Sequence, residues 1–353
     1  IDTSGNKSEL NAAISVTPKL VDDDIFAEIR DKTLHIKTNA QMQQWIDSLN
    51  DVTSDTITYT DVSNNYNIVK IYNTVTDFTI NRGIAILCSD LFTIEGIGKP
   101  IIKVNFSNAY NRIVIKSRGF NCKKIKFLNY TTVSGWRRSL FALVNYDTSK
   151  NKAIFEETDG EDATGSYTVL VSGSYSLDVK SGYFKNFRIN TFEGDFLQNN
   201  IFESVNITGI NNPLTAVVTI KNVKILGNVF KNTKISSSTS SYETAEYITI
   251  NDNTFDFTFE NTDGGTAVCV EALPLGLLNI QLSTNNNKIR VRNIAGTSPK
   301  SIRFIDALSR DYIFSQICNN SFYSENPSLV TLSTFLNCTG STTGTIIANN
   351  TNN

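Results

Sequence analysis

The sequence is nearly without histidine, the residue on which many catalytic and metal sites depend. Its 353 residues include one histidine, His35, in the short apolar stretch Thr33–Ile36. A Ser-His-Asp or Cys-His catalytic set needs a histidine as its base, and many metal sites need several. Both kinds of site are therefore nearly excluded within one chain. We interpret His35 as a structural residue.

Cysteine is also scarce, and its number is odd. The five cysteines lie far apart in the chain, at Cys88, Cys122, Cys269, Cys318 and Cys338. This spacing matches neither a disulfide framework nor the closely placed ligands of a metal site. We expect most of them to be small apolar core residues, and we expect no metal ion or other cofactor.

The chain has little charge of either sign and no long apolar run. Charged residues make up 19% of the sequence, and 32 basic against 34 acidic residues leave a formal net charge of −2. The basic residues are dispersed, which argues against nucleic acid or an anionic membrane as partner. No run approaches the roughly 18 apolar residues of a transmembrane helix, so no membrane insertion is expected. The first residues, Ile1–Gly5, do not form a signal peptide.

What the chain does contain is a repeat centred on asparagine. The pattern is apolar, any, apolar, two polar or small residues, asparagine, any, then an aromatic or apolar residue. Residues 223–230 and 248–255 are its cleanest copies. The asparagines of the clean and degraded copies are Asn200, Asn228, Asn253, Asn287, Asn320 and Asn350, which are 28, 25, 34, 33 and 30 residues apart. A strand, a tight polar turn and a second strand at such intervals indicate a stacked solenoid.

The chemistry of asparagine indicates which solenoid. Its amide both donates and accepts hydrogen bonds, so asparagines stacked one coil apart, at about 4.8 Å, bond to one another along the axis. It also tolerates the left-handed backbone of a tight turn. Flanking segments such as Phe255–Glu260 alternate apolar and polar residues, as strands with one buried face do. The pattern predicts an all-β fold, a parallel β-helix. A β-sandwich with asparagine-rich turns explains the alternation but not the recurring frame.

The repeat frame extends toward the N-terminus. Residues 113–120 keep it with Arg118 at the asparagine position, and residues 177–184 keep it with Gly182. We expect about ten coils in a β-helix over residues 60–353, preceded by a linker or neck at 1–37 and a capping segment at 38–59. In the capping segment, Thr38 and Asn39 would begin a helix from about residue 40 to 49. Its apolar face would plug the first coil, through Met42, Trp45, Ile46 and Leu49.

The N-terminal residues and the architecture together resemble a known family. Lys7–Ile14 and Lys19–Ala27 resemble the linker of phage tail fibres, and the order of linker, capping helix and β-helix resembles bacteriophage tailspike receptor-binding proteins. The resemblance implies a single-stranded right-handed, pectate-lyase-like parallel β-helix in the phage tail of the virion. It also implies a homotrimer that acts extracellularly on a bacterial surface polysaccharide, a capsule or an O-antigen. No motif here allows the family's catalytic residues to be carried over.

Candidate site residues lie mainly where insertions interrupt the repeat, in residues 130–148, 156–167 and 236–247. Glu193 and Asp195, two residues apart, are the first catalytic pair because extended backbone would place them on one face, and glycoside hydrolysis uses two carboxyl groups. The alternative, that they are two solvated turn carboxylates, is the one that the sequence favours. In the sequence, the Trp136 indole lies beside the guanidinium groups of Arg137 and Arg138, and this trio would suit an acidic sugar. The alternative is that Trp136 packs under its own loop. The remaining candidates are Trp136, Arg137, Arg138 and Tyr242 for substrate binding, and Glu243 and Glu246 as alternative catalytic carboxylates.

Three functions remain open at this level. The first is a tailspike that binds a polysaccharide and depolymerises it by hydrolysis or by uronate elimination. Carboxylates suffice for hydrolysis, which we favour, and lysine, arginine or tyrosine can act in elimination. The second is a non-enzymatic receptor-binding fibre or adhesin on the same scaffold. The third is a cellular polysaccharide lyase or epimerase, against which the linker resemblance argues.

Overall fold

The computed structural model describes most of the chain from residue 29 onward. The described residues are 29–73, 77–133, 139–148, 151–165, 168–173, 175–191, 196–203, 213–217, 223–237, 247–258, 266–271, 279–292, 299–306, 311–312, 315–338 and 342–353. At some ends of these segments only the backbone is described.

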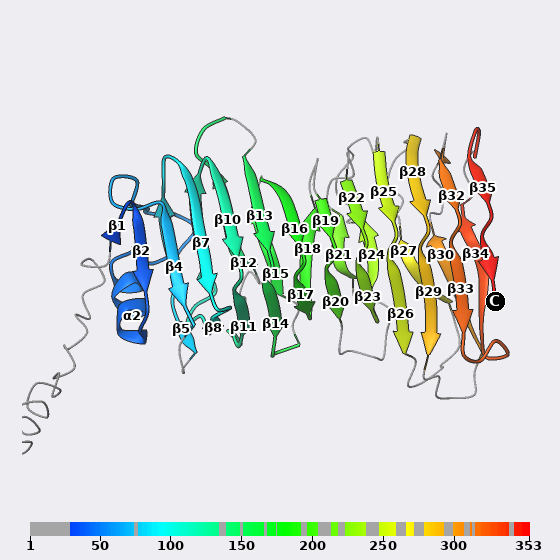
Figure 1. Ribbon diagram of the computed structural model, residues 1–353, viewed down its shortest axis with the longest axis horizontal. Coiled ribbons are helices and arrows are strands. Elements are labelled where there is room, and N and C mark those ends of the chain that lie inside the picture. Colours follow the sequence, from blue (N-terminus) through cyan, green and yellow to red (C-terminus); the bar gives the residue numbers. More distant parts are fainter. Residues whose placement is uncertain are drawn as a thin grey trace, which may run out of the picture.

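The described chain is a parallel β-helix, which confirms the predicted fold (Figure 1). Each coil contributes strands to three sheets that run the length of the rod. Sheet I contains β1 (Ile29–Arg30), β2 (Thr33–Ile36), β4 (Ile68–Tyr72), β7 (Leu91–Ile97), β10 (Gly119–Lys123), β13 (Lys152–Glu156), β16 (Ser176–Lys180), β19 (Phe196–Gln198), β22 (Val223–Leu226), β25 (Tyr247–Asn251), β28 (Asn279–Asn285), β31 (Asp311–Tyr312), β32 (Gln316–Cys318) and β35 (Ile346–Ala348).

The other two sheets are built in the same way. Sheet II contains β5 (Phe78–Ile80), β8 (Ile101–Val104), β11 (Lys126–Asn129), β14 (Asp159–Asp162), β17 (Tyr183–Lys185), β20 (Ile201–Glu203), β23 (Val229–Lys231), β26 (Thr254–Thr258), β29 (Lys288–Arg292), β33 (Ser321–Ser324) and β36 (Thr351–Asn352). Sheet III contains β3 (Thr60–Asp61), β6 (Ile84–Leu87), β9 (Ile113–Ser117), β12 (Ser139–Asn145), β15 (Thr168–Gly173), β18 (Phe187–Thr191), β21 (Pro213–Val217), β24 (Lys234–Ser237), β27 (Thr266–Glu271), β30 (Lys300–Asp306) and β34 (Val330–Asn337).

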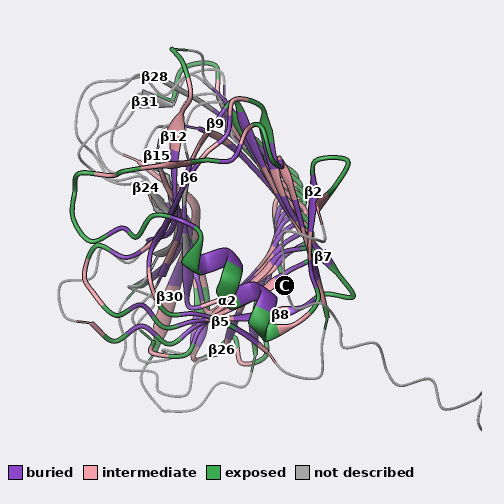
Figure 2. Cartoon of the chain, turned by 90° about the vertical axis from the view of Figure 1, so that its left-hand side faces the viewer, coloured by how far each residue is buried: buried purple, intermediate pink, exposed green. Residues whose placement is uncertain are grey.

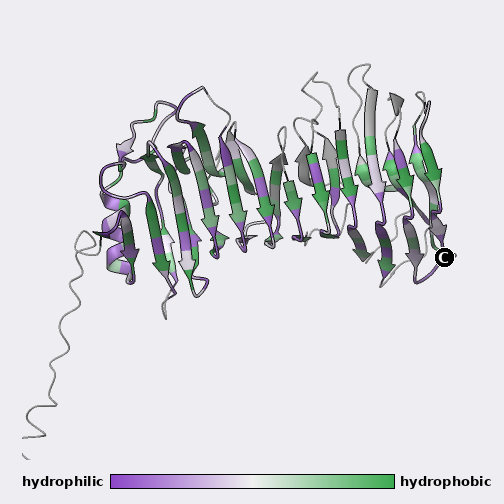
Figure 3. Ribbon diagram, turned by 45° about the horizontal axis from the view of Figure 1, so that its top comes forward, coloured by the Kyte–Doolittle hydropathy of each residue, from purple (hydrophilic) through white to green (hydrophobic). Residues whose placement is uncertain are grey.

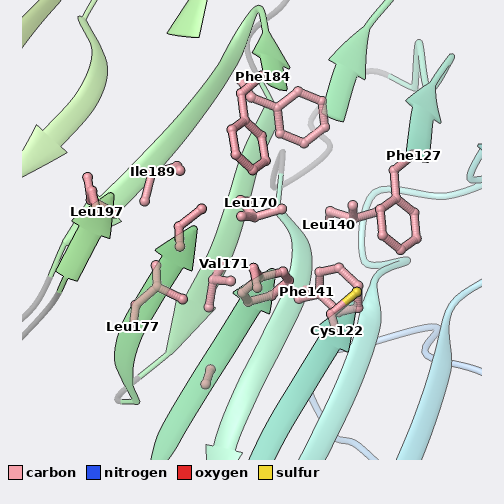
Figure 4. Packing of buried hydrophobic residues seen from close by; sticks show 14 of the residues in the cluster. Cys122, Phe127, Leu140, Phe141, Leu170, Val171, Leu177, Phe184, Ile189 and Leu197 are labelled. Carbon is pink, nitrogen blue, oxygen red and sulfur yellow. The ribbon is translucent and has the colours of Figure 1, made fainter. Parts of the chain in front are cut away.

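Alternating side chains fill the interior of the rod. Hydrophilic and hydrophobic residues alternate along the strands (Figure 3), and so do exposed and buried ones (Figure 2). Most of the buried apolar residues form one core cluster. Residues from all three sheets meet there, among them Cys122, Phe141 and Phe184 (Figure 4). From Phe184 onward, phenylalanines stack between coils, with ring centroids of Phe202 and Phe230 5.3 Å apart and of Phe230 and Phe255 5.0 Å apart. Such a packed core makes the sheet faces rigid.

A helix covers the N-terminal end of this core (Figure 2). Helix α2 (Asn39–Asp47) begins after Thr38, whose side-chain oxygen accepts the Gln41 amide hydrogen bond at 3.1 Å. Met42, Trp45 and Ile46 are buried, and the Trp45 indole donates to the Tyr66 hydroxyl at 3.0 Å. The expected apolar face is confirmed and Trp45 is a core residue. The helix ends at Asp47 rather than near residue 49, and Leu49 is buried just beyond it.

The strand ladder begins before the helix and ends in an exposed edge. Strand β2 already pairs in parallel with β4, so the parallel part of sheet I starts at Thr33, whereas the sequence placed the start of the β-helix near residue 60. At the other end, Ile347 stacks on Ile317 in the same inward column. Ile347 is 52% exposed, whereas Ile317 is fully buried. The last described coil therefore leaves apolar core surface facing solvent.

The predicted asparagine ladder is present in full. Each side-chain amide donates to the side-chain oxygen of the asparagine one coil further on, at 2.9 to 3.1 Å, through Asn200, Asn228, Asn253, Asn287, Asn320 and Asn350. That same oxygen also accepts the backbone amide of the preceding asparagine. The first five of these side chains are buried, so the ladder satisfies polar groups at the turn from sheet I to sheet II.

The frame before residue 200 is only partly as expected. Gly182 occupies the ladder column, and its backbone amide donates to the Asn200 side chain at 2.9 Å. Arg118 does not, because it lies between β9 of sheet III and β10 of sheet I, at a different corner of the coil. The ladder column of that coil is instead occupied by Ile125, between β10 and β11. Apolar alternation is the same on every strand, so the pattern alone does not identify the corner.

Candidate functional site

The site residues named from the sequence lie outside the described residues. They are Glu193, Asp195, Glu243, Glu246, Trp136, Arg137, Arg138 and Tyr242. Their proposed roles therefore stay predictions. The described residues place other groups on the outward faces of sheets I and II, and these are the groups from which a site can be built.

The segment 156–167, expected as an acidic insertion, contains a strand of the β-helix, β14. Strand β14 takes its place in sheet II, paired with β11 and β17. Its carboxylates have close partners: Asp159 lies 2.7 Å from the Lys99 ammonium group, and Glu161 lies 3.1 Å from that of Lys185. Asp162 is buried and accepts from the Thr168 hydroxyl at 2.6 Å. These carboxylates belong to the scaffold because basic residues at matching positions balance them, which composition alone did not reveal.

The outward side chains of sheet II form a row that alternates in sign. Glu203, Lys231, Asp256 and Arg290 follow one another across β20, β23, β26 and β29. Glu203 and Lys231 are 3.5 Å apart. The next pair differs from simple stacking, because Asp256 bonds the Arg292 guanidinium rather than that of Arg290. Exposed pairs of this kind contribute little to stability, so the row mainly sets the surface charge.

Tyr183 is joined to the same row by a hydrogen bond. Its hydroxyl donates to Glu203 at 3.1 Å, and its backbone amide donates to Asp159 at 3.0 Å. Desolvation raises the pKa of Tyr183 to about 12, and the negative charges of Glu203, Glu161 and Asp159 act in the same direction. The neutral phenol is therefore the form that the folded protein favours.

This pKa predicts a loss of stability in alkali. Because the folded-state pKa is raised, the contribution of Tyr183 is fully present below its ordinary value of 10.0 and is lost as pH rises toward about 12. We expect the urea midpoint of Tyr183→Phe to fall less than that of the wild type across this interval. Equal losses in the two proteins would contradict the assignment. In Glu203→Gln, the tyrosinate absorbance assigned to Tyr183 by difference should appear at lower pH.

Asp178 on sheet I is the described carboxylate with the least ordinary surroundings. Strand β16 places Leu177 and Val179 in the core, so Asp178 points outward, yet it is only 4% exposed. Its Oδ2 lies 2.9 Å from the Lys152 ammonium group and 3.3 Å from that of Lys180. Its Oδ1 is buried and has no hydrogen-bond partner among the described residues. A buried carboxylate oxygen without a donor is costly, which makes it a candidate for a functional role.

The surroundings of Asp178 include an aromatic ring and a second carboxylate. Asp178 is in register with Phe196 of the next coil, and the Lys180 ammonium group lies 5.5 Å from the centre of that ring. Glu156 of the preceding coil is in register with Lys180. From the strand spacing, the Cα atoms of Asp178 and Glu156 are about 8 Å apart. Carboxyl groups separated by roughly 6.5–9.5 Å suit inverting glycoside hydrolysis.

Sequence reasoning missed Asp178 although its signal was present. The residue occupies the outward position of a strand that reads apolar, polar, apolar, with lysine two residues later. The second lysine, Lys152, is 26 residues away in the sequence and comes close only through the register of β13 with β16. Its nearness depends on the exact length of that coil. Asp195, predicted as catalytic, directly precedes Phe196, the register partner of Asp178.

The described residues offer no other familiar catalytic or metal centre. His35 is half-buried on β2 with its Nδ1 2.9 Å from the Tyr72 hydroxyl, an arrangement that fits a structural role. In this part of the chain the five cysteines are free, with Cys88, Cys122 and Cys269 buried. Within the same residues no three histidine, cysteine or carboxylate side chains gather as a metal site needs. Nor does any described helix have the length and apolar character to cross a membrane.

Comparisons with known proteins identify no family for this chain. No protein-family model matches it, no curated protein matches its sequence, and no solved structure matches its fold.

Proposed function

We propose that this protein binds a bacterial surface polysaccharide along the side of its β-helix and depolymerises it, as phage tailspikes do at the host surface. The observation that carries the proposal is Asp178, an outward carboxylate that is almost completely buried and has one oxygen free of hydrogen bonds. Lys152 and Lys180 compensate its charge on the other oxygen. We propose that this oxygen, which finds no donor among the described residues, accepts a proton from the water that attacks the glycan.

A hydrolysis that uses these residues balances with one water molecule. Asp178 would remove a proton from the water as it attacks the anomeric carbon. A second carboxyl group would donate a proton to the departing glycosidic oxygen. Glu156 is one candidate for this role because its Cα lies about 8 Å from that of Asp178, and its carboxylate lies 3.3 Å from the Lys123 ammonium group. Glu193 and Asp195 remain the candidates named from the sequence. The aromatic face of Phe196 would pack against a sugar ring.

A non-enzymatic receptor-binding fibre is the second candidate function. It is favoured by sheet II, where Glu161, Glu203 and Asp256 each form an ion pair with a neighbouring basic side chain. Unlike Asp178, none of these three carboxylates has a buried oxygen without a hydrogen-bond partner, so no residue among them stands out as a catalytic base. The two functions use the same scaffold and differ in whether the glycan is cleaved.

The proposal is tested with capsular and O-antigen polysaccharides purified from a panel of bacterial strains. We expect the protein to lower the molar mass of at least one of them and to release new reducing ends. Binding without any fall in molar mass would support the non-enzymatic fibre. Absorbance from unsaturated uronates would replace hydrolysis with elimination, and neither binding nor cleavage would refute both functions.

We also propose that the native protein is a homotrimer. Three rods around one axis present three linked binding sites, and linked sites raise the overall avidity for a repeating polymer. Sedimentation equilibrium at micromolar concentration should give three times the chain mass of 39.2 kDa. A single-chain mass for the native full-length protein would contradict the proposal.

A further inference from the structure

Strand β29 carries an outward row of three basic side chains. Ile289 and Val291 are buried in the core, while Lys288, Arg290 and Arg292 alternate with them and are exposed. Neighbouring members of this row are two residues apart, or about 6.8 Å along the strand. This spacing is fixed because the strand is hydrogen-bonded on both sides, to β26 and β33.

Two of these three cations are not balanced by acidic side chains. Arg292 bonds Asp256 of β26. Neither Lys288 nor Arg290 forms an ion pair within the described residues. Other basic residues of the same sheet differ, since Lys185 and Lys231 both pair with glutamates of neighbouring strands. The outer face of β29 is therefore a locally basic surface on a protein whose formal net charge is −2.

An exposed aromatic ring lies beside the basic row. Tyr323 of β33 is the register partner of Arg290, and it is 50% exposed (strands β29 and β33 in Figure 1). Ser321 and Thr254 are the register partners of Lys288 on its two sides, so hydroxyl groups flank that ammonium group. A flat ring, a free guanidinium group and hydroxyls are thus held side by side by the sheet.

We propose that the outer face of β29 and β33 binds an acidic saccharide, and this inference rests on the proposed polysaccharide-binding function. The Arg290 guanidinium would hold a uronate carboxylate through two parallel hydrogen bonds. The apolar face of the same sugar would stack on Tyr323, and Lys288 would bind the carboxylate of a neighbouring unit. The site selects saccharides that carry carboxylates over neutral ones of the same length.

The test is a calorimetric titration of the full chain with galacturonate, glucuronate and mannuronate oligomers. The same oligomers after chemical reduction of their carboxyl groups serve as neutral references. We expect at least one acidic oligomer to bind and its reduced form to bind about tenfold more weakly or not at all. Arg290→Gln and Tyr323→Ala should each lose about tenfold in affinity, while Tyr323→Phe keeps the ring and the binding.

Lys231→Gln is the matched control. Lys231 lies in the row that crosses sheet II from Glu203 to Arg290, but it is paired with Glu203. It should bind as the wild type does, and all variants should share the wild-type circular dichroism and melting midpoint. Absence of binding by all three acidic oligomers overturns the inference. Wild-type affinity in Arg290→Gln or Tyr323→Ala also overturns it. The same holds if the wild type binds a single-stranded oligonucleotide of matched charge as tightly as the acidic oligomer, because that result would indicate a generic polyanion site.

Failure of this site is distinguishable from failure of the proposed function. If the wild type degrades or binds a strain polysaccharide, and Arg290→Gln and Tyr323→Ala do so with unchanged half-saturation, the function stands and the β29 site is refuted. If the wild type acts on no strain polysaccharide, the function fails, and the titration with uronate oligomers still decides whether the site exists.

Discussion

Replacing Asn253 by alanine is expected to lower the free energy of unfolding by about 3 kcal/mol, because two buried polar groups lose their partners. The side-chain oxygen of Asn253 accepts the backbone amide of Asn228 at 2.9 Å, and its amide donates to the Ile225 carbonyl at 2.9 Å. Both partners belong to fully buried residues, where water does not replace the lost bonds. Asn253→Asp should cost more, since it sets a carboxylate against the Asn287 side-chain oxygen, which Asn253 now contacts as a donor at 3.1 Å.

The matched control is Asn285→Ala. Asn285 also accepts a backbone amide from the next coil, that of Cys318 at 3.1 Å, but it is half-exposed on the outer side of sheet I. Water can solvate the freed groups there, so the loss should stay below about 1 kcal/mol. Asn350→Ala, at the half-buried end of the ladder, should also cost less than Asn253→Ala. Urea midpoints measure all four variants, and a midpoint of Asn253→Ala equal to the wild type would refute the stacking role.

The second large effect is expected on turnover. On a polysaccharide that the wild type degrades, Asp178→Asn should reduce the rate by roughly a hundredfold or more, the usual effect of removing a general base. The amide keeps the shape of the side chain but does not take a proton from water. Polysaccharide binding should be retained, because Lys152, Lys180 and Phe196 are unchanged.

The control for this variant is Asp159→Asn on sheet II. Asp159 is also an outward carboxylate held by a lysine, Lys99, but its other oxygen already accepts the Tyr183 amide. Its turnover should equal that of the wild type. Wild-type turnover in Asp178→Asn would remove Asp178 from the chemistry and return the search to Glu193 and Asp195. His35→Ala should be as active as the wild type in either case.

The parallel β-helix was predictable from the sequence because the repeat that produces it is a short local pattern. An asparagine in the same frame six times, between short alternating strands, has few structural explanations, and the ladder followed from it. The capping helix followed from the apolar face that begins after Thr38. The prediction that Arg118 occupies the ladder position was wrong, because each coil has three corners and apolar alternation alone does not distinguish them. Positive backbone φ angles occur at the residue before the ladder position, as at Lys124 and Asn199, although Asn186 and Asn232 at another corner also have them. Those angles are not visible in the sequence where the residue is lysine.

The candidate site was less predictable because it depends on register. Asp178 and Lys152 come from different coils, as do Arg290 and Tyr323, and coil lengths vary. An insertion of one residue would move either pair apart or turn a side chain inward. The acidic segment after Glu156 was taken for a loop for the same reason, since its basic partners on β11 and β17 are distant in sequence.

The most direct test of binding along the side of the β-helix is lysine footprinting of the full chain, with and without a polysaccharide that it binds. Acetylation followed by mass spectrometry reports which ammonium groups the glycan covers. The account predicts protection of Lys152, Lys180 and Lys288 on the coil faces, with Lys32 and Lys37 near the capped end unprotected. Protection confined to Lys32 and Lys37, or equal acetylation of all five lysines with and without bound glycan, would contradict it.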